Sequence, residues 1–251
     1  QYEVLFPALV KEICPEIDYW PASPSSGGHF EDPNADDRGD VHYWQVWHGN
    51  KPFAEYRRHY FRFLSEFGFE SFPSLKTVKA FTTAEDRNIF SPVMEDHQRC
   101  DGGNGKILTY LAQYFRYPKD FEALLYVSQL SQAEAMRYAV EHLRRQRGRC
   151  MGVTYWQLND NWPVASWSSI DYFGRWKALH YFARRMFDQI LISCEDEENR
   201  ASIHISNEHN FAIAGTVGWK LLTLSGEVIE QGEMQAQAPA LTSVKLIDLD
   251  F

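Results

Sequence analysis

Apolar residues recur at every third or fourth position over residues 120–146, which predicts a long amphipathic helix, and again over residues 175–187. Short runs of aromatic and β-branched residues, each bounded by Gly, Pro, Asn or Asp, predict strands. Four such runs precede residue 160, and they cover residues 17–24, 39–47, 59–67 and 150–158. Strands that alternate with helices indicate βα units around a parallel sheet.

The pattern changes after about residue 189. The runs "RASIHISNE", "AIAGTVGWKLLTL", "GEVIEQGEMQAQ" and "LTSVKLIDLD" are β-type segments separated by turn residues, without helical spacing. They predict the beginning of an antiparallel β-sandwich. We therefore expect two domains, residues 1–188 and residues 189–251.

Composition and charge narrow the range of partners. The chain has 251 residues, of which 44% are hydrophobic and 24% charged, and its formal net charge is −9. An acidic protein without a basic face is a poor ligand for nucleic acid, so we expect no nucleic-acid partner. The one basic cluster, residues 143–149, ends the long predicted helix and is interpreted as a solvated helix end. No run of about 18 apolar residues occurs, so we expect no membrane span.

Several kinds of site are disfavoured by the motifs. The four cysteines form no CxxC pair, which favours free thiols in a reducing compartment. The nine histidines show no ligand spacing, so we expect no metal and no cofactor. The stretch "DGGNGKI" (101–107) lacks the Gly and the Ser or Thr of a phosphate loop and is predicted to be an ordinary loop. The chain begins with Gln inside an amphipathic pattern, and we expect it to be a piece of a longer protein.

Candidate chemistry lies at the ends of the predicted strands, where a parallel αβ barrel carries its site. Those ends hold Ser23, the segment 42–48, Glu66 and the segment "WQLNDNW" (156–162). Glu66 stands in "RFLSEFGFESFP", and an ionised carboxylate among so many apolar rings requires nearby donors. Indole faces with amides and carboxylates suit a sugar, and a strand-end Glu flanked by aromatic residues suits the nucleophile of a retaining glycoside hydrolase.

Each candidate also has a purely structural interpretation, such as a surface acid, core filling, a turn cap, a buried imidazole or a loop tip. Their convergence on one rim favours a site. The candidates are Glu66 as the catalytic residue and Trp156, His48, Trp47, His42, Asn159 and Asp160 as substrate-binding residues.

Two long motifs, "SEFGFESFP" and "GVTYWQLNDNWPVASWSSIDYFGRWKALHYF", closely resemble the β-mannosidases. These belong to the large family of retaining glycosidases that also holds β-galactosidases and β-glucuronidases. "GDVHYWQVWHG" and "YWPASPSSGG" match the same group, so the resemblance covers nearly all of residues 1–190. The remainder resembles, more weakly, the β-sandwich that follows the barrel in that family.

The resemblance implies an α/β fold, the C-terminal half of a TIM (β/α)8 barrel followed by an incomplete antiparallel β-sandwich. It implies that Glu66 is the nucleophile and that Trp156 forms part of the −1 sugar platform. Trp47 and His48 should lie near Glu66. Some relatives carry Tyr at the position of His48 as a hydrogen-bond partner of the nucleophile, so His48 is a departure from their pattern.

A second departure concerns the acid/base. The family's acid/base Glu follows an Asn at the end of the fourth barrel strand, and the only Asn–Glu here, in "SNEH" (206–209), falls in the β-rich tail. We therefore expect a retaining exo-glycosidase for terminal β-D-mannose residues that acts on β-mannosides or manno-oligosaccharides within a longer chain. This chain alone should be inactive, and its open barrel edges should form homo-oligomers.

Three alternatives stay open. The specificity could be that of a sibling β-galactosidase or β-glucuronidase. The chain could also be a non-catalytic carbohydrate-binding protein, or a structural protein built on a worn-out barrel. Relatives are lysosomal in animals and often intracellular in bacteria, and we expect a cytoplasmic location, with a lysosomal or secreted one as the alternative.

Overall fold

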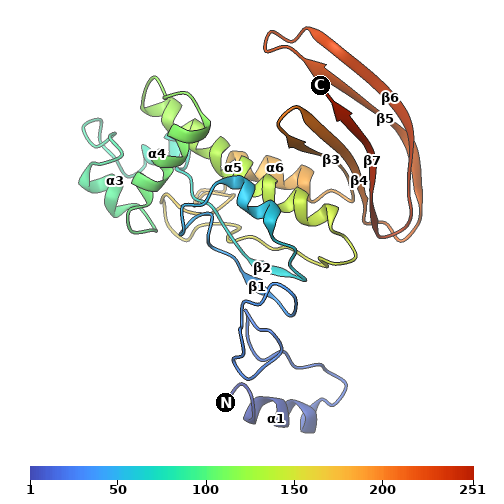
Figure 1. Cartoon of the computed structure of the whole chain (residues 1–251). Coiled ribbons are helices and arrows are strands. Elements are labelled where there is room, and N and C mark those ends of the chain that lie inside the picture. The colour runs from blue at the N-terminus through green and yellow to red at the C-terminus, as the bar shows by residue number, and fades with distance from the viewer. The chain divides into compact units, whose positions relative to one another are not determined.

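The computed structural model describes all residues from 1 to 251. The chain forms two compact units, each of which is described by itself (Figure 1). The first unit comprises Gln1–Leu143 and Arg149–Met186, and the second comprises Arg144–Gly148 and Phe187–Phe251.

Helices make up most of the regular structure of the first unit (Figure 1). They are α1 (Leu5–Ile13), the 3₁₀ helix η1 (Phe53–Arg58), α2 (Leu75–Val78), α3 (Pro92–Asp96), α4 (Gly103–Tyr114), α5 (Phe121–Arg145), whose last two residues belong to the second unit, and α6 (Ala178–Met186). The helices α5 and α6 confirm the two helical predictions. Along α5 the side chains of Ala133, Met136, Val140 and Leu143 are buried, because one apolar stripe faces the core.

Three segments of the first unit run parallel to one another. Strand β1 (Val41–His42) pairs with β2 (Leu64–Glu66), and Leu64 forms a parallel bridge with Val153 on the other side. The predicted strands 39–47 and 59–67 are therefore confirmed as short strands, and 150–158 forms isolated bridges instead of a strand. The strand predicted over 17–24 is wrong: Pro21 and Pro24 remove backbone donors, and only Ser25 forms an antiparallel bridge, with Asp40.

The core of the first unit lies where the segment after β2 meets α4 and α5. Phe67, Phe69 and Phe72 are at most 1% exposed. Side chains of α5 anchor this segment, since the Ser128 hydroxyl accepts a hydrogen bond from the backbone N–H of Phe72 at 3.1 Å. The Gln132 amide donates to the carbonyl oxygen of Phe69 at 2.8 Å. The residues that follow Glu66 are therefore rigidly held.

Two local predictions are wrong. The stretch 101–107 is not a loop throughout, because α4 begins at Gly103 and buries Asn104 and Ile107. The basic cluster is not a solvated helix end either. Arg144 and Arg145 are at most 8% exposed, and within the second unit Arg145 pairs with Glu195 at 3.5 Å. Helical spacing does not reveal such tertiary partners.

The second unit carries the β strands predicted after residue 189, and all of them pair antiparallel. One sheet has the order β3-β4-β7, and β5 pairs with β6 in a second sheet. The strands are β3 (Ile190–Glu197), β4 (Arg200–Asn207), β5 (Ile213–Leu222), β6 (Val228–Ala238) and β7 (Thr242–Asp250).

None of the helices combines the length and the hydropathy that a membrane crossing requires.

Candidate active site

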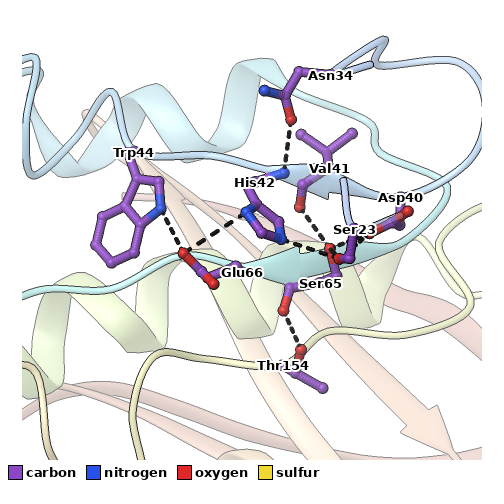
Figure 2. A network of polar contacts seen from close by, with 9 residues as sticks. All are labelled: Ser23, Asn34, Asp40, Val41, His42, Trp44, Ser65, Glu66 and Thr154. Carbon is purple, nitrogen blue, oxygen red and sulfur yellow. Dashed lines mark hydrogen bonds and ion pairs between the residues drawn. The ribbon is translucent and has the colours of Figure 1, made fainter. Parts of the chain in front are cut away.

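Glu66 is the last residue of β2 and lies at the centre of a polar network (Figure 2). Its neighbours Leu64 and Phe67 are completely buried, whereas the Glu66 side chain keeps 25% of its surface exposed. Its backbone carbonyl accepts a hydrogen bond from the N–H of Tyr43 at 2.8 Å, which ties the end of β2 to the segment after β1. The core thus anchors the backbone, and the carboxylate remains accessible.

Two side chains from the neighbouring segment supply the partners that this carboxylate requires. The indole Nε1–H of Trp44 donates to Glu66 Oε1 at 3.0 Å, and Nδ1 of His42 lies 3.7 Å from the same oxygen (Figure 2). A donor to a carboxylate stabilises its ionised form, as does a protonated imidazole nearby. The role of Trp44 was not predicted, although its spacing of two from His42 places both side chains on one face of an extended segment.

Asp40 forms the second centre of the network. Its Oδ2 accepts from the hydroxyls of Ser23 at 2.6 Å and Ser65 at 2.5 Å, and its Oδ1 accepts from the indole N–H of Trp20 at 2.9 Å and the backbone N–H of Ser25 at 3.0 Å. Burial opposes ionisation, but these four hydrogen bonds outweigh it and lower the pKa of Asp40. No sequence pattern pointed to Asp40, because its partners come from distant positions.

Trp156 has an accessible indole, and its backbone joins the segment that follows Glu66. Its backbone N–H donates to the carbonyl oxygen of Phe67 at 2.8 Å, and its side chain is 45% exposed. The Trp156–Gln157 peptide bond is cis. Gly68 makes the close approach possible, since a Cβ there would stand 2.4 Å from the carbonyl oxygen of Trp156 and 2.9 Å from the ring of Trp44.

His48 does not contact Glu66 directly. Its ring lies 5.1 Å from the ring of Trp44 and 6.4 Å from that of Trp167, measured between centroids. Burial, together with the positive charge of Lys106, lowers its pKa. Trp44 therefore holds the position next to the carboxylate, and the exposed His48 packs against the ring of Trp44.

Trp47 belongs to the core, which corrects its predicted role in substrate binding. Its side chain is completely buried, and its ring packs edge-on against Phe69 at 4.9 Å and stacks with Tyr110 at 6.5 Å. No face of the indole is accessible to a sugar. Sequence proximity to His48 was misleading, because Trp44 and Trp47 point to opposite environments.

The segment after Trp156 also contains one buried and one exposed candidate residue. Asp160 is 7% exposed and accepts hydrogen bonds from the hydroxyls of Ser166 at 3.0 Å and Ser168 at 2.6 Å, so it stabilises its own loop. Its predicted contact with substrate is corrected on this ground. Asn159 is exposed, and its carbonyl oxygen accepts from the amide of Gln157 at 3.0 Å, which leaves the Asn159 side chain accessible.

A second carboxylate free to act as a general acid is not present in the network of Figure 2. Asp40 is its only other carboxylate, and both of its oxygens are occupied by donors. Glu208, from the Asn–Glu dipeptide, lies in the second unit, where it pairs with Arg147 at 3.1 Å. The network therefore holds one accessible carboxylate, and retaining glycosidases require two catalytic ones.

Comparisons with known proteins show which proteins the chain resembles. The profile of the family described as "Mannosidase Ig/CBM-like domain" matches residues 199–251. The proteins named beta-mannosidase B from Aspergillus niger and Emericella nidulans are each 38% identical to the chain over 208 residues, which is 80% of this chain and 24% of those proteins. The chain thus spans about a quarter of the length of these curated relatives.

Solved structures give the same result. The crystal structure of the β-D-mannosidase from Dictyoglomus thermophilum superposes with a TM-score of 0.92 and 32% identity, covering 99% of this chain and 30% of that one. The exo-chitosanase from Amycolatopsis orientalis has a TM-score of 0.64 and 21% identity over 74% of this chain and 23% of its own, which shows a likeness of fold alone. The chain therefore belongs to the β-mannosidase family of glycoside hydrolases, of whose members it spans a segment.

Proposed function

We propose that this chain is the nucleophile-bearing segment of a retaining exo-β-mannosidase that hydrolyses terminal β-D-mannose residues. The observation that carries the proposal is the partly exposed carboxylate of Glu66 at the end of β2, which has Trp44 and His42 as partners. The exposed indole of Trp156, whose backbone bonds to Phe67, supports it. The names of the relatives support β-mannosides or manno-oligosaccharides as substrates.

In this proposal Glu66 attacks the anomeric carbon, and the aglycone leaves on the opposite face of the sugar. The glycosyl–Glu66 ester that results is then hydrolysed by water, so the configuration is retained overall. Trp44 and His42 fix the direction of the carboxylate, which prepares it for attack without reorganisation. The indole of Trp156 offers an apolar face for the sugar ring, and the accessible Asn159 and His48 contact hydroxyls at the edge of the site.

The fold fits the same proposal. We assign residues 1–188 to the C-terminal half of a (β/α)8 barrel, on the basis of the parallel contacts among β1, β2 and Val153. Residues 189–251 are assigned to the start of the following β-sandwich, which the family match over residues 199–251 supports. The acid/base then comes from another part of the complete protein, and its absence here costs a factor of roughly 10²–10⁴ in rate.

We also propose a cytoplasmic location for the protein. The isolated chain should associate with itself through its open sheet edges, and solution scattering would detect this association.

The test is covalent trapping in the complete protein. A 2-deoxy-2-fluoro-β-mannosyl fluoride should label Glu66, and peptide mass mapping should find the adduct within the segment that contains it. The Glu66→Gln variant should take up no label, and the matched variant Glu70→Gln should be labelled like the wild type. Label on any other residue would contradict the proposal.

A non-catalytic carbohydrate-binding protein is the second candidate. It is favoured by the exposed Trp156 together with the lack of a second free carboxylate in the network of Glu66. Calorimetry with mannobiose on the complete protein separates the two functions. A binding protein binds mannobiose without hydrolysing it, whereas an enzyme hydrolyses it. A panel of nitrophenyl glycosides on the complete protein distinguishes β-mannosidase from the sibling β-galactosidase and β-glucuronidase specificities.

A further inference from the structure

The hydrogen bond from Trp44 to Glu66 depends on how the ring of Trp44 is packed. Its N–H donates to Glu66 Oε1 at 3.0 Å (Figure 2). At the outer end of the same ring, Cη2 would stand only 2.9 Å from a Cβ on Gly68, two residues beyond Glu66. The indole is therefore fixed at two points, by the carboxylate and by its close approach to the backbone of Gly68.

A second indole, that of Trp167, packs against the first. Its Cδ1 would stand 3.1 Å from the same Cβ on Gly68, so both indoles approach this glycine. The ring centroids of Trp44 and Trp167 are 6.0 Å apart, and the ring planes meet at 75°, which is an edge-on arrangement that aromatic rings favour. The indole of Trp44 thus contacts a ring on one side and the bare backbone of Gly68 on another.

The backbone around Trp167 is firmly held. Ser166 forms an antiparallel bridge with Ser71, in which the N–H of Ser71 donates to the carbonyl oxygen of Ser166 at 3.0 Å. The carbonyl oxygen of Trp167 accepts a hydrogen bond from the N–H of Gln157 at 3.2 Å. The side chain of Trp167 is partly buried and packs against the core of the first unit. Trp167 is therefore a fixed surface that limits the rotation of Trp44.

This limit bears directly on the hydrogen bond to Glu66. An N–H···O contact of 3.0 Å is lost when it lengthens to about 3.6 Å, which requires a shift of only about 0.6 Å. Removing the ring of Trp167 opens a space much larger than such a shift. The indole N–H of Trp167 is itself buried without a hydrogen-bond partner, so its effect on Trp44 comes from shape and not from hydrogen bonding.

We propose that Trp167 is a positioning residue for Glu66, which acts through Trp44 by keeping that indole against Gly68 with its N–H on the carboxylate. The inference rests on the proposed function of Glu66. A merely structural role, in the packing of the first unit, predicts a loss of stability without a change in kcat. A direct contact of Trp167 with substrate predicts a rise in KM instead.

The chain offers variants that distinguish these roles. Trp167→Ala removes the ring, and Trp167→Phe keeps a ring but removes the unpartnered N–H. Trp44→Phe removes the hydrogen bond through which Trp167 acts, so Trp167→Ala should have no further effect in that background. Trp219→Ala is the matched control, since this indole is also partly buried but lies in the second unit, where it packs against Phe251.

The experiment measures the rate of labelling by the 2-fluoromannosyl reagent, and kcat and KM for p-nitrophenyl β-mannoside, in the complete protein. Because a misplacement of about 1 Å near the chemistry costs up to about 100-fold, we expect Trp167→Ala to lower kcat and the labelling rate by about 5- to 50-fold, with KM changed less than about twofold. Trp167→Phe should come within about threefold of the wild type, since the smaller ring still limits the rotation of Trp44. Trp219→Ala should match the wild type.

A crystal structure of the Trp167→Ala variant gives a readout that does not depend on catalysis. The distance between Nε1 of Trp44 and Glu66 Oε1 should exceed about 3.5 Å, the limit of a hydrogen bond. An unchanged distance would overturn the inference.

Three kinetic results would also overturn it: a wild-type labelling rate in Trp167→Ala, equal losses in Trp167→Ala and Trp167→Phe, or a loss that multiplies with that of Trp44→Phe. If Trp167→Ala fails to fold, Trp167→Leu replaces it in both backgrounds and is judged by the same criteria. Failure of the proposed function gives a different result, since the wild-type protein would then carry no label on Glu66, while the distance between Trp44 and Glu66 would still lengthen in the variant.

Discussion

Glu66 and Glu70 stand four residues apart in one stretch of chain, and their surroundings are opposite. Glu66 is partly exposed and has two partners, the indole of Trp44 and the imidazole of His42. Glu70 is completely buried, and neither of its carboxylate oxygens has a hydrogen-bond partner. The difference shows that the local sequence determines the position of a carboxylate along the chain, whereas residues from other segments determine its burial and its hydrogen-bond partners.

The buried carboxylate is closed in by α4 and by a buried lysine. A Cβ on Gly103, the first residue of α4, would stand 2.6 Å from Glu70 Oε2. Burial raises the pKa of Glu70 well above its usual value, and the charge of Lys177 opposes the shift only in part. Burial also lowers the pKa of Lys177 to about 8. The ammonium of Lys177 donates to the carbonyl oxygens of Ser71 at 3.2 Å and Ser166 at 3.1 Å.

The largest expected effect is the difference in kcat between variants of Glu66 and variants of Glu70. In the complete protein, Glu66→Gln should lower kcat for p-nitrophenyl β-mannoside by a factor on the order of 10⁴ or more, because the variant lacks the proposed nucleophile. Glu70→Gln should retain kcat within a few-fold, since its side chain is sealed from substrate. Equal losses in the two variants would break the comparison.

The next effect concerns the buried indole of Trp47 and the exposed indole of Trp156. Trp47→Ala should lower the free energy of unfolding by about 3–5 kcal/mol, because it empties a packed site between Phe69 and Tyr110. Urea denaturation measures this loss. The matched change Trp156→Ala, at an exposed ring, should cost far less stability and should instead raise KM. A large loss of stability in Trp156→Ala with little loss in Trp47→Ala would contradict the assignment of Trp47 to the core and of Trp156 to the site.

A smaller effect sharpens the account of Glu66. Trp44→Phe keeps an aromatic ring against His48 but removes the N–H that binds the carboxylate. A hydrogen bond to a charged group contributes about 1.5–3 kcal/mol, so labelling of Glu66 should slow by roughly 10- to 150-fold. The melting temperature of the variant serves as the control. Labelling at the wild-type rate would show that Trp44 is not needed to hold the carboxylate of Glu66.

The smallest effect is the pH dependence of stability at Glu70. Since the pKa of Glu70 is raised in the folded protein, the unfolded chain releases this proton first as pH rises, and stability falls above the usual pKa of about 4.5. Glu70→Gln removes this loss. It should therefore be more stable than the wild type by on the order of 1 kcal/mol at pH 7 and equally stable at pH 4. Parallel denaturation curves at the two pH values test this, and an unchanged difference would show that Glu70 does not titrate in this way.

Much of the fold could be predicted from periodicity. The apolar stripe of α5 and the short aromatic runs of β1 and β2 carry their own signals, because they depend on residues close in sequence. The prediction over 17–24 was wrong because a strand depends on partners that two prolines cannot bond. The start of α4 was missed because its glycines suggest a loop, and only the burial of Ile107 and Tyr110 favours a helix there.

The sequence predicted the central residues of the candidate site, but not the residues that hydrogen-bond to one another around them. Glu66 and Trp156 stand in motifs that the sequence displays. The hydrogen bonds of Asp40 join residues that are 15 to 25 positions apart, and no local pattern announces them. Trp44 and Trp47 show the same limit, since two indoles three residues apart differ only in what packs against them.

By itself, the amino-acid sequence determined the family of this protein, the alternation of strands and helices in its first part and the Glu that ends β2. Only the tertiary structure decided that the carboxylate of Glu66 accepts a hydrogen bond from Trp44, whereas the buried carboxylate of Glu70 has no hydrogen-bond partner. The reason is that hydrogen bonding and burial depend on groups brought together from distant segments, and the free energy of a charge is set by those groups and not by its neighbours along the chain.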